Sequence, residues 1–112
     1  MGRKVYPAGR SPYPFRMPFV VIARFTAKEG AEAQLRGVLS ALVEPTREEE
    51  GCLHYELVQS QANPRMFTFF EKWASVQALE AHTQTAHIQH ARQARVPFLD
   101  GPTDVSRWDV VA

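Results

Sequence analysis

The chain has 112 residues, 45% of them hydrophobic, and its 13 basic and 12 acidic residues give a formal net charge of +1. This length fits one domain, and this hydrophobic content is too high for a disordered chain. The balanced charge offers no basic patch of the kind that favours nucleic acid. The single cysteine, Cys52, excludes an intrachain disulfide and a cysteine-lined metal cage.

The first 18 residues differ in composition from the rest, because they combine basic residues with prolines at positions 7, 12, 14 and 18. Proline at this density disfavours helices and central strands, so we expect an N-terminal extension, residues 1–18, before a domain at residues 19–112. The extension lacks the apolar segment of a secretory signal. The apolar run that starts at Phe19 is broken by Arg24, far short of the roughly 20 residues that span a membrane. We therefore expect a soluble, cytoplasmic protein.

The first half of the domain reads as a strand followed by a helix. Residues 19–26 are β-branched and aromatic, which predicts a strand, and Lys28-Glu29-Gly30 predicts a turn. Residues 31 to about 49 predict an amphipathic helix, whose apolar positions recur at helical spacing: Leu35, Val38, Leu39, Leu42 and Val43. Pro45 should kink this helix, and Gly51 is placed to end it.

The second half predicts a hairpin, two helical segments and a last strand. Residues 52–59 and 66–73 form the strands of the antiparallel hairpin, joined by a turn at Asn63-Pro64. Ser75 is a plausible N-cap for a helix to about residue 83, a second helix covers about 85–98, and a strand covers 103–111. This order predicts an α+β fold of the ferredoxin-like βαββαβ type, with a four-stranded antiparallel sheet and its helices on one face.

Both faces of the predicted sheet carry large apolar side chains. In the first strand Val21 and its alternate neighbours point one way, and Val20 and Ile22 point the other way. In the third strand Phe69 and Phe70 likewise occupy opposite faces. Helices can cover only one face, and an exposed apolar patch usually marks an interface. We therefore expect a homodimer that forms sheet against sheet.

The residues best suited to chemistry lie in the middle of the chain. Glu71 and Trp73 share one face of the third strand, and His82 and His87 follow on the helical segments. Histidine beside an apolar pocket is a natural general base, because its pKa is near neutrality. Alternatively, these histidines only hydrogen-bond helix ends. The sequence holds no phosphate loop, dinucleotide fingerprint or nucleophile elbow, so we expect no cofactor.

Several other residues could have a functional or a structural role. His87 and His90 are close on one helix, but no acidic or thiol residue stands at a recognised ligand spacing, so we expect no metal. Arg24 needs a partner in an apolar strand, either Glu71 or a carboxylate across the dimer. Tyr55 should pack with its hydroxyl at the rim of the sheet, and Cys52 reads as a small buried apolar residue.

Residues 19–111 resemble the antibiotic biosynthesis monooxygenase family of dimeric α/β-barrel proteins, which includes small quinol monooxygenases. Four stretches carry the resemblance: VVIARFTAKEGAEAQL, LVEPTREEEGCLHYEL, FTFFEKWAS with its Glu-x-Trp strand, and ALEAHTQTAHIQHAR with its two histidines. The resemblance implies a ferredoxin-like subunit, a sheet-to-sheet homodimer and a pocket between sheet and helices.

The resemblance also implies oxidation of a small aromatic or quinol substrate by O₂, without metal or flavin. His82 or His87 would orient or deprotonate the substrate, Glu71 would position a histidine or Arg24, and Trp73 would form a pocket wall. The expected site residues are thus His82, His87 and Glu71 as catalytic groups, with Trp73, Phe69, Val21 and Tyr55 binding substrate.

Three alternatives accompany this expectation. Haem-degrading relatives use an asparagine and a haem-ligating histidine where this sequence has Ala23 and Arg92, which argues against haem degradation. An isomerase-type proton-transfer enzyme would use the same pocket. A non-catalytic dimeric binding module for a small apolar metabolite would need no base at all.

Overall fold

The computed structural model of the protein describes residues 18–112, and nearly all of the expected extension, residues 1–18, lies outside that range. Its elements, in chain order, are β1 (Phe19–Thr26), α1 (Glu32–Ser40), α2 (Val43–Arg47), β2 (Cys52–Gln59), β3 (Met66–Trp73), α3 (Val76–Thr83), α4 (Ala86–Ala94), the 3₁₀ helix η1 (Val96–Phe98) and β4 (Asp104–Asp109).

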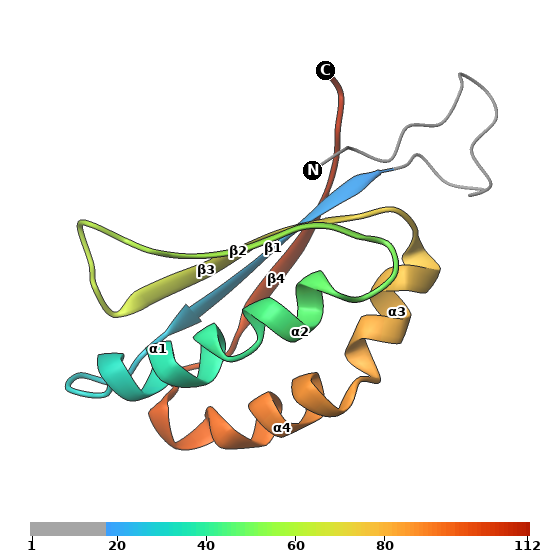
Figure 1. Ribbon diagram of the computed structural model, residues 1–112. Helices are drawn as coiled ribbons and strands as arrows, with labels where there is room; N and C mark the ends of the chain where they lie inside the picture. Colours follow the sequence, from blue (N-terminus) through green and yellow to red (C-terminus); the bar gives the residue numbers. More distant parts are fainter. Residues whose placement is uncertain (1–17) are drawn as a thin grey trace, which may run out of the picture.

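The four strands form one antiparallel sheet in the order β2-β3-β1-β4. The helices all lie on one side of it, as Figure 1 shows. This is the predicted ferredoxin-like βαββαβ arrangement. β1 and β3 occupy the centre, and Val21 pairs with Glu71 while Ala23 pairs with Phe69. The centre of the sheet therefore brings the candidate residues of β3 beneath the helical layer.

The first three strands begin and end at the predicted residues, whereas the long first helix is broken in two. The helix ends at Ser40 and restarts at Val43, five and two residues before Pro45. Proline has no N–H to donate to residue 41 and its ring crowds that carbonyl, so the helix cannot run through unchanged. Pro45 is tolerated in the first turn of α2, where the N–H would lack an intrahelical partner anyway.

The helical region between β3 and β4 forms two α-helices, as predicted, with a short turn between α3 and α4. Ser75 caps α3 as predicted, because its hydroxyl oxygen accepts a hydrogen bond from the Ala78 N–H at 3.0 Å. Thr85 caps α4 and accepts from the Ile88 N–H at 3.4 Å. These caps satisfy backbone donors at the two helix N-termini and fix where α4 starts relative to α3.

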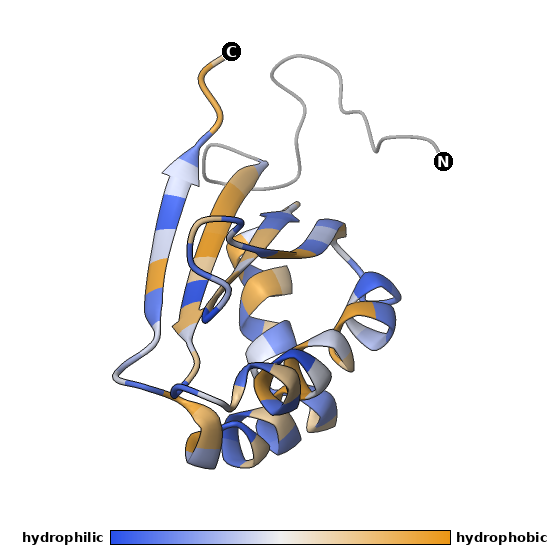
Figure 2. Ribbon diagram, turned by 90° about the vertical axis from the view of Figure 1, so that its left-hand side faces the viewer, coloured by the Kyte–Doolittle hydropathy of each residue, from blue (hydrophilic) through white to orange (hydrophobic). Residues whose placement is uncertain are grey.

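The helices cover one apolar face of the sheet and leave the other uncovered, as predicted. On the helix side, Val21, Phe69 and Trp73 are buried in the core. On the other side Phe70 is 40% exposed and Trp108 is 54% exposed. Figure 2 shows hydrophobic colour along most of β1, whereas the edge strand β4 is mostly hydrophilic. Within residues 18–112, no helix is long and apolar enough to cross a bilayer.

Candidate functional site

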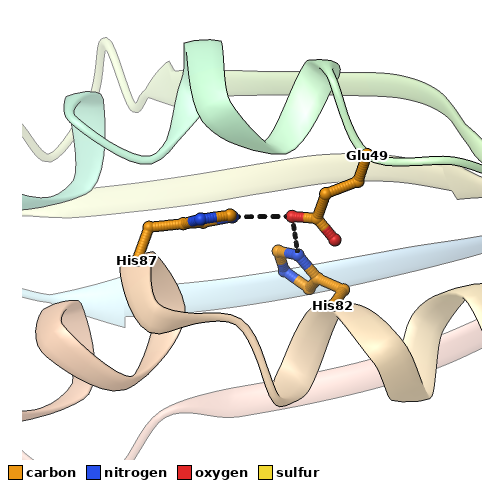
Figure 3. A group of neighbouring side chains, drawn as sticks. All are labelled: Glu49, His82 and His87. Carbon is orange, nitrogen blue, oxygen red and sulfur yellow. Dashed lines mark hydrogen bonds and ion pairs between the residues drawn. The ribbon is translucent and has the colours of Figure 1, made fainter.

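Two imidazole nitrogens lie within hydrogen-bonding distance of the same carboxylate oxygen of Glu49. Oε2 of Glu49 lies 2.8 Å from Nδ1 of His82 and 2.7 Å from Nε2 of His87. The three side chains converge from the segment after α2, from α3 and from α4 (Figure 3). Their exposure rises outward, from 6% for the side chain of His82 to 14% for Glu49 and 26% for His87. The cluster therefore has a buried end at His82 and an open end at His87.

Glu49 is held by a tight turn that docks on α3. The turn continues through Gly51, whose φ of 82° is in the left-handed region that favours glycine. A Cβ on Gly51 would lie 2.5 Å from the Cβ of Ala78 in α3, and the Gly51 carbonyl accepts from the Ala74 N–H at 2.9 Å. Only glycine thus allows the turn to approach α3 closely enough to place Glu49 beside His82.

The two histidines are positioned by the turn between their helices. The Thr85 hydroxyl donates to the His82 carbonyl at 2.8 Å, and the Thr85 N–H donates to the same oxygen at 3.2 Å. His87 then stands on the first turn of α4. These hydrogen bonds fix the backbone of His82 at the start of the turn that leads to His87.

A carboxylate can only accept hydrogen bonds, so ionised Glu49 requires a proton on each of the two nitrogens that face it. In its neutral form His82 then carries its proton on Nδ1 and a lone pair on Nε2. Burial lowers the pKa of His82 most strongly, against the opposing effect of Glu49. A lowered pKa favours the neutral ring, and the neutral ring is the form that accepts a proton.

Aromatic rings enclose the buried end of the cluster. The Trp73 ring is 4.8 Å from the His82 ring between centroids, and the Tyr55 ring is 5.6 Å from it in an edge-on arrangement. Tyr55 in turn stacks on Phe69 at 4.7 Å. Trp73 is 0% exposed, Phe69 is 1% exposed and Tyr55 is 2% exposed. Burial raises the pKa of the Tyr55 phenol, so it stays protonated.

Glu71 is a buried carboxyl with one side-chain partner in the described structure. It accepts from Nε1 of Trp73 at 2.9 Å. Burial raises its pKa from 4.5 to about 7, although the Trp73 hydrogen bond opposes the shift. The expectation that Glu71 positions a histidine or Arg24 is wrong on geometry: Glu71 orients the Trp73 indole, Glu49 orients both histidines, and Arg24 is exposed on the opposite face of the sheet.

The predicted site residues lie together beneath the helices, and the structure adds Glu49 to them. Val21 is buried opposite Glu71 in the sheet, and Phe69 and Tyr55 pack as a pair beside His82. Glu49 is separated by 33 residues from His82 and by 38 from His87, so no local spacing signals the contact. Its one sequence signal is the run Glu48-Glu49-Glu50 before Gly51.

Two other residues considered from the sequence stand outside this cluster. His90 is exposed on α4. Cys52 is half-buried, and burial raises the pKa of its thiol to about 11, so it carries little thiolate at neutral pH. Tyr55 packs in the core as predicted, but it is only 2% exposed, so its hydroxyl is not at the rim of the sheet.

Comparisons with known proteins agree with this fold. The sequence profile described as "Antibiotic biosynthesis monooxygenase" matches residues 18–94. The chain is 36% identical over 89 residues to "Putative monooxygenase Rv0793" of Mycobacterium tuberculosis, covering 80% of this chain and 87% of the relative. It is 33% identical over 70 residues to "Putative monooxygenase YcnE" of Bacillus subtilis, covering 62% and 74%.

Solved structures give the same result. The crystal structure of PA3566 from Pseudomonas aeruginosa superposes with a TM-score of 0.81 and 33% identity, covering 85% of this chain and 95% of that one. The Rv0793 structure gives a TM-score of 0.80 and 32% identity, covering 86% and 97%. On the sequence profile, the relatives and the shared fold, this chain belongs to the antibiotic biosynthesis monooxygenase family.

Proposed function

We propose that this protein is a cofactor-independent monooxygenase that oxidises a small phenol or hydroquinone with O₂. The observation that supports the proposal is the pair of hydrogen bonds at Glu49. Its Oε2 lies 2.8 Å from Nδ1 of His82 and 2.7 Å from Nε2 of His87. A carboxylate that orients a histidine, with the other ring nitrogen left as a lone pair, is a general-base arrangement. The names of two relatives support a monooxygenase.

In the proposed reaction His82 takes the phenolic proton of the substrate. The phenolate that forms is rich in electrons and passes one to O₂, and recombination gives a peroxide on the ring carbon. Loss of water from the peroxide leaves a carbonyl. For a hydroquinone the balance is one quinol plus one O₂ giving one hydroxyquinone plus one water, so the substrate supplies every electron. Glu49 stabilises the imidazolium that forms on His82.

The surrounding side chains suit an aromatic substrate. Trp73, Phe69 and Tyr55 form an apolar wall at the buried end of the cluster, and Val21 extends the same face. Such a wall excludes water from a radical or peroxide intermediate. Glu71 serves as a positioning residue, since its hydrogen bond fixes the Trp73 indole. The open end at His87, 26% exposed, is the side from which a substrate would enter.

We also propose that the protein works as a homodimer formed through the uncovered face of the sheet. Phe70 and Ile22 pair at its centre, and Trp108 pairs with Val20 beside them. Val58 and Phe70 are 45% and 40% exposed in the single chain. Burying the exposed part of such side chains favours association, at roughly 25 cal/mol for each Å² of apolar surface removed from water. The cluster around Glu49 lies on the other face, so each subunit would hold a complete site.

Oxygen consumption tests the function. Chelator-treated protein is given a panel of hydroquinones in an oxygen electrode, and the product is identified by mass spectrometry with ¹⁸O₂. Loss of a general base lowers rates by about 10²–10⁴-fold, so we expect a kcat loss of that size in His82→Ala. Glu49→Gln should lose less, and its KM should change little, because Glu49 touches the base and not the substrate.

The matched control is His90→Ala, which removes an exposed histidine from the same helix as His87. Oxygen uptake that His82→Ala and His87→Ala both leave intact, in variants with unchanged circular dichroism, would remove the catalytic assignment. If no compound is oxidised, saturable quenching of Trp73 in a Trp108→Phe background would favour a binding module. Deuterium exchange into a bound ligand without oxygen uptake would favour an isomerase-type enzyme.

A further inference from the structure

The cluster around Glu49 also has the composition of a metal site. Each of Glu49, His82 and His87 offers one potential ligand atom, and these atoms all lie within 4.8 Å of one another. We propose that Glu49, His82 and His87 bind one divalent first-row transition metal ion, of which Zn²⁺ and Co²⁺ are the practical probes. This inference goes beyond the proposed oxidation and does not depend on it.

The spacing of the ligand atoms is close to that of a coordinated ion. Zinc binds imidazole nitrogen at about 2.0–2.1 Å and carboxylate oxygen at about 2.0–2.2 Å, which separates adjacent ligands of a tetrahedral ion by roughly 3.3 Å. The present distances from Oε2 are 2.8 Å and 2.7 Å. An ion bound to both imidazole nitrogens would occupy the space that Oε2 now fills, so the Glu49 carboxylate must withdraw and coordinate the ion from its new position.

The ligand types select the class of metal. Two imidazoles with one carboxylate suit zinc, iron, cobalt and nickel, whereas magnesium and calcium prefer oxygen ligands alone. Three protein ligands leave coordination positions free, which is typical of sites that bind water or a small ligand and not of closed structural sites. The open end at His87 faces the side from which these positions would be filled, since its side chain is 26% exposed.

The protein around the cluster is built to hold the ligands in place. His82 packs against the rings of Trp73 and Tyr55, which restricts its orientation. The backbone of His82 is fixed by two hydrogen bonds from Thr85. Gly51 fixes the turn that carries Glu49 against α3. Ligands held in advance lose little conformational freedom when an ion binds, which favours affinity.

Metal binding would change which nitrogen of each histidine carries the proton. A nitrogen that binds a metal uses its lone pair, so the proton of His82 would move from Nδ1 to Nε2. The lone pair at Nε2, which the proposed base requires, would then be absent. Bound metal and the metal-free oxidation are therefore alternative states of the same cluster, and metal binding should inhibit the proposed reaction.

Direct titration of the tag-free, chelator-treated protein tests the inference without any substrate. Co²⁺ should bind at one equivalent per chain with visible d–d absorption bands, and Zn²⁺ should displace it and raise the melting temperature. We expect a dissociation constant below about 10 µM, weakened at least tenfold in Glu49→Gln and in His87→Ala. ¹⁵N spectra of the histidines should show the change of tautomer at His82.

His90→Ala and Glu48→Gln are the matched controls, because each removes a potential ligand from the same helix or the same acidic run. Both should bind Co²⁺ as the unmodified protein does. The inference is overturned if Co²⁺ shows no saturable binding, or if Glu49→Gln and His87→Ala, folded by circular dichroism, bind it as tightly as the controls. If the metal-free protein consumes no oxygen with any hydroquinone while Co²⁺ still binds to the cluster, only the proposed oxidation is contradicted.

Discussion

Glu71 shows how a single buried group can couple stability to pH. Its side chain is covered by the helical layer and accepts one hydrogen bond, from Trp73. Burial raises its pKa from 4.5 to about 7, and the nearby carboxylate of Glu49 adds to the rise. Tyr55 and Cys52 also face it across the sheet, and both are neutral at pH 7. The folded state therefore holds a proton that the unfolded chain has released at pH 6.

This raised pKa predicts that Glu71→Gln stabilises the protein at high pH. Below about pH 4.5 the folded and the unfolded wild type both hold the proton, so the ionisation of Glu71 does not lower the stability of the wild type there. As pH rises from about 4.5 through about 7 the wild type loses stability, because the unfolded chain releases this proton readily whereas the folded state must bury a charge to release it. A shift of this size corresponds to roughly 1–3 kcal/mol. Urea denaturation should show the variant more stable by that amount at pH 8, and nearly equal at pH 5.

Glu56→Gln provides the comparison for Glu71→Gln, since Glu56 is exposed on the neighbouring strand. Glu56→Gln should change the free energy of unfolding little at either pH, because any ion pair of an exposed glutamate contributes little to stability. A constant difference between Glu71→Gln and wild type from pH 5 to pH 8 would mean that Glu71 does not titrate in this range.

At the scale of elements, the site depends on how a turn docks against a helix. α2 packs on β2, and the Arg47 guanidinium donates from Nε to the Tyr55 carbonyl at 3.0 Å. The chain then turns at Gly51 and passes close to Ala78 of α3. The break before Pro45 lets α2 pack on β2, and the turn at Gly51 follows directly. Pro45 and Gly51 together therefore determine the position of Glu49.

Gly51→Ala should therefore be strongly destabilising. A left-handed backbone costs a residue with a Cβ roughly 1–2 kcal/mol, and the new Cβ would lie 2.5 Å from that of Ala78, so one element must shift. We expect a loss above about 2 kcal/mol in the free energy of unfolding, measured with urea. The shift should also weaken Co²⁺ binding, because Glu49 is on the displaced turn.

Gly37→Ala is the matched substitution, because Gly37 lies inside α1 with nothing within 4 Å of an added Cβ. Alanine in a helix is favoured over glycine by about 0.5–1 kcal/mol, so this variant should be more stable than wild type. Equal effects of the two substitutions would show that the contact between Gly51 and α3 does not constrain the fold.

At the scale of the whole molecule, the uncovered sheet face predicts the oligomeric state. Phe70→Glu places a charge at the centre of this face, opposite Ile22. Burying an unpaired charge is costly, so the variant should sediment as a monomer at micromolar concentration, where the wild type should sediment as a dimer. Val96→Glu is the control, since Val96 is 63% exposed on η1 in the helical layer. Monomeric wild-type protein would contradict the proposed dimer.

The sequence by itself determined where the strands are, because the residue types and their order along the chain favour strands at these positions. β-Branched and aromatic residues in Phe19–Thr26 and Met66–Trp73, and alternation in Cys52–Gln59, predict bounds that the structure confirms. The fourth strand, predicted at 103–111, is shorter, at Asp104–Asp109. The predicted Ser75 cap is confirmed as well, because capping is local. The two faces of the sheet follow from the same alternation, and so does the gathering of Tyr55, Phe69 and Trp73.

Only the tertiary structure decided the partner of the histidines. Three consecutive glutamates precede Gly51, and nothing in their spacing distinguishes Glu49 from Glu48 or Glu50. The turn at Gly51 determines which glutamate makes the contact. It places the Glu49 carboxylate beside His82 and His87, which are 33 and 38 residues later in the chain. Local patterns specify elements, whereas a contact of such sequence separation is fixed by how those elements pack.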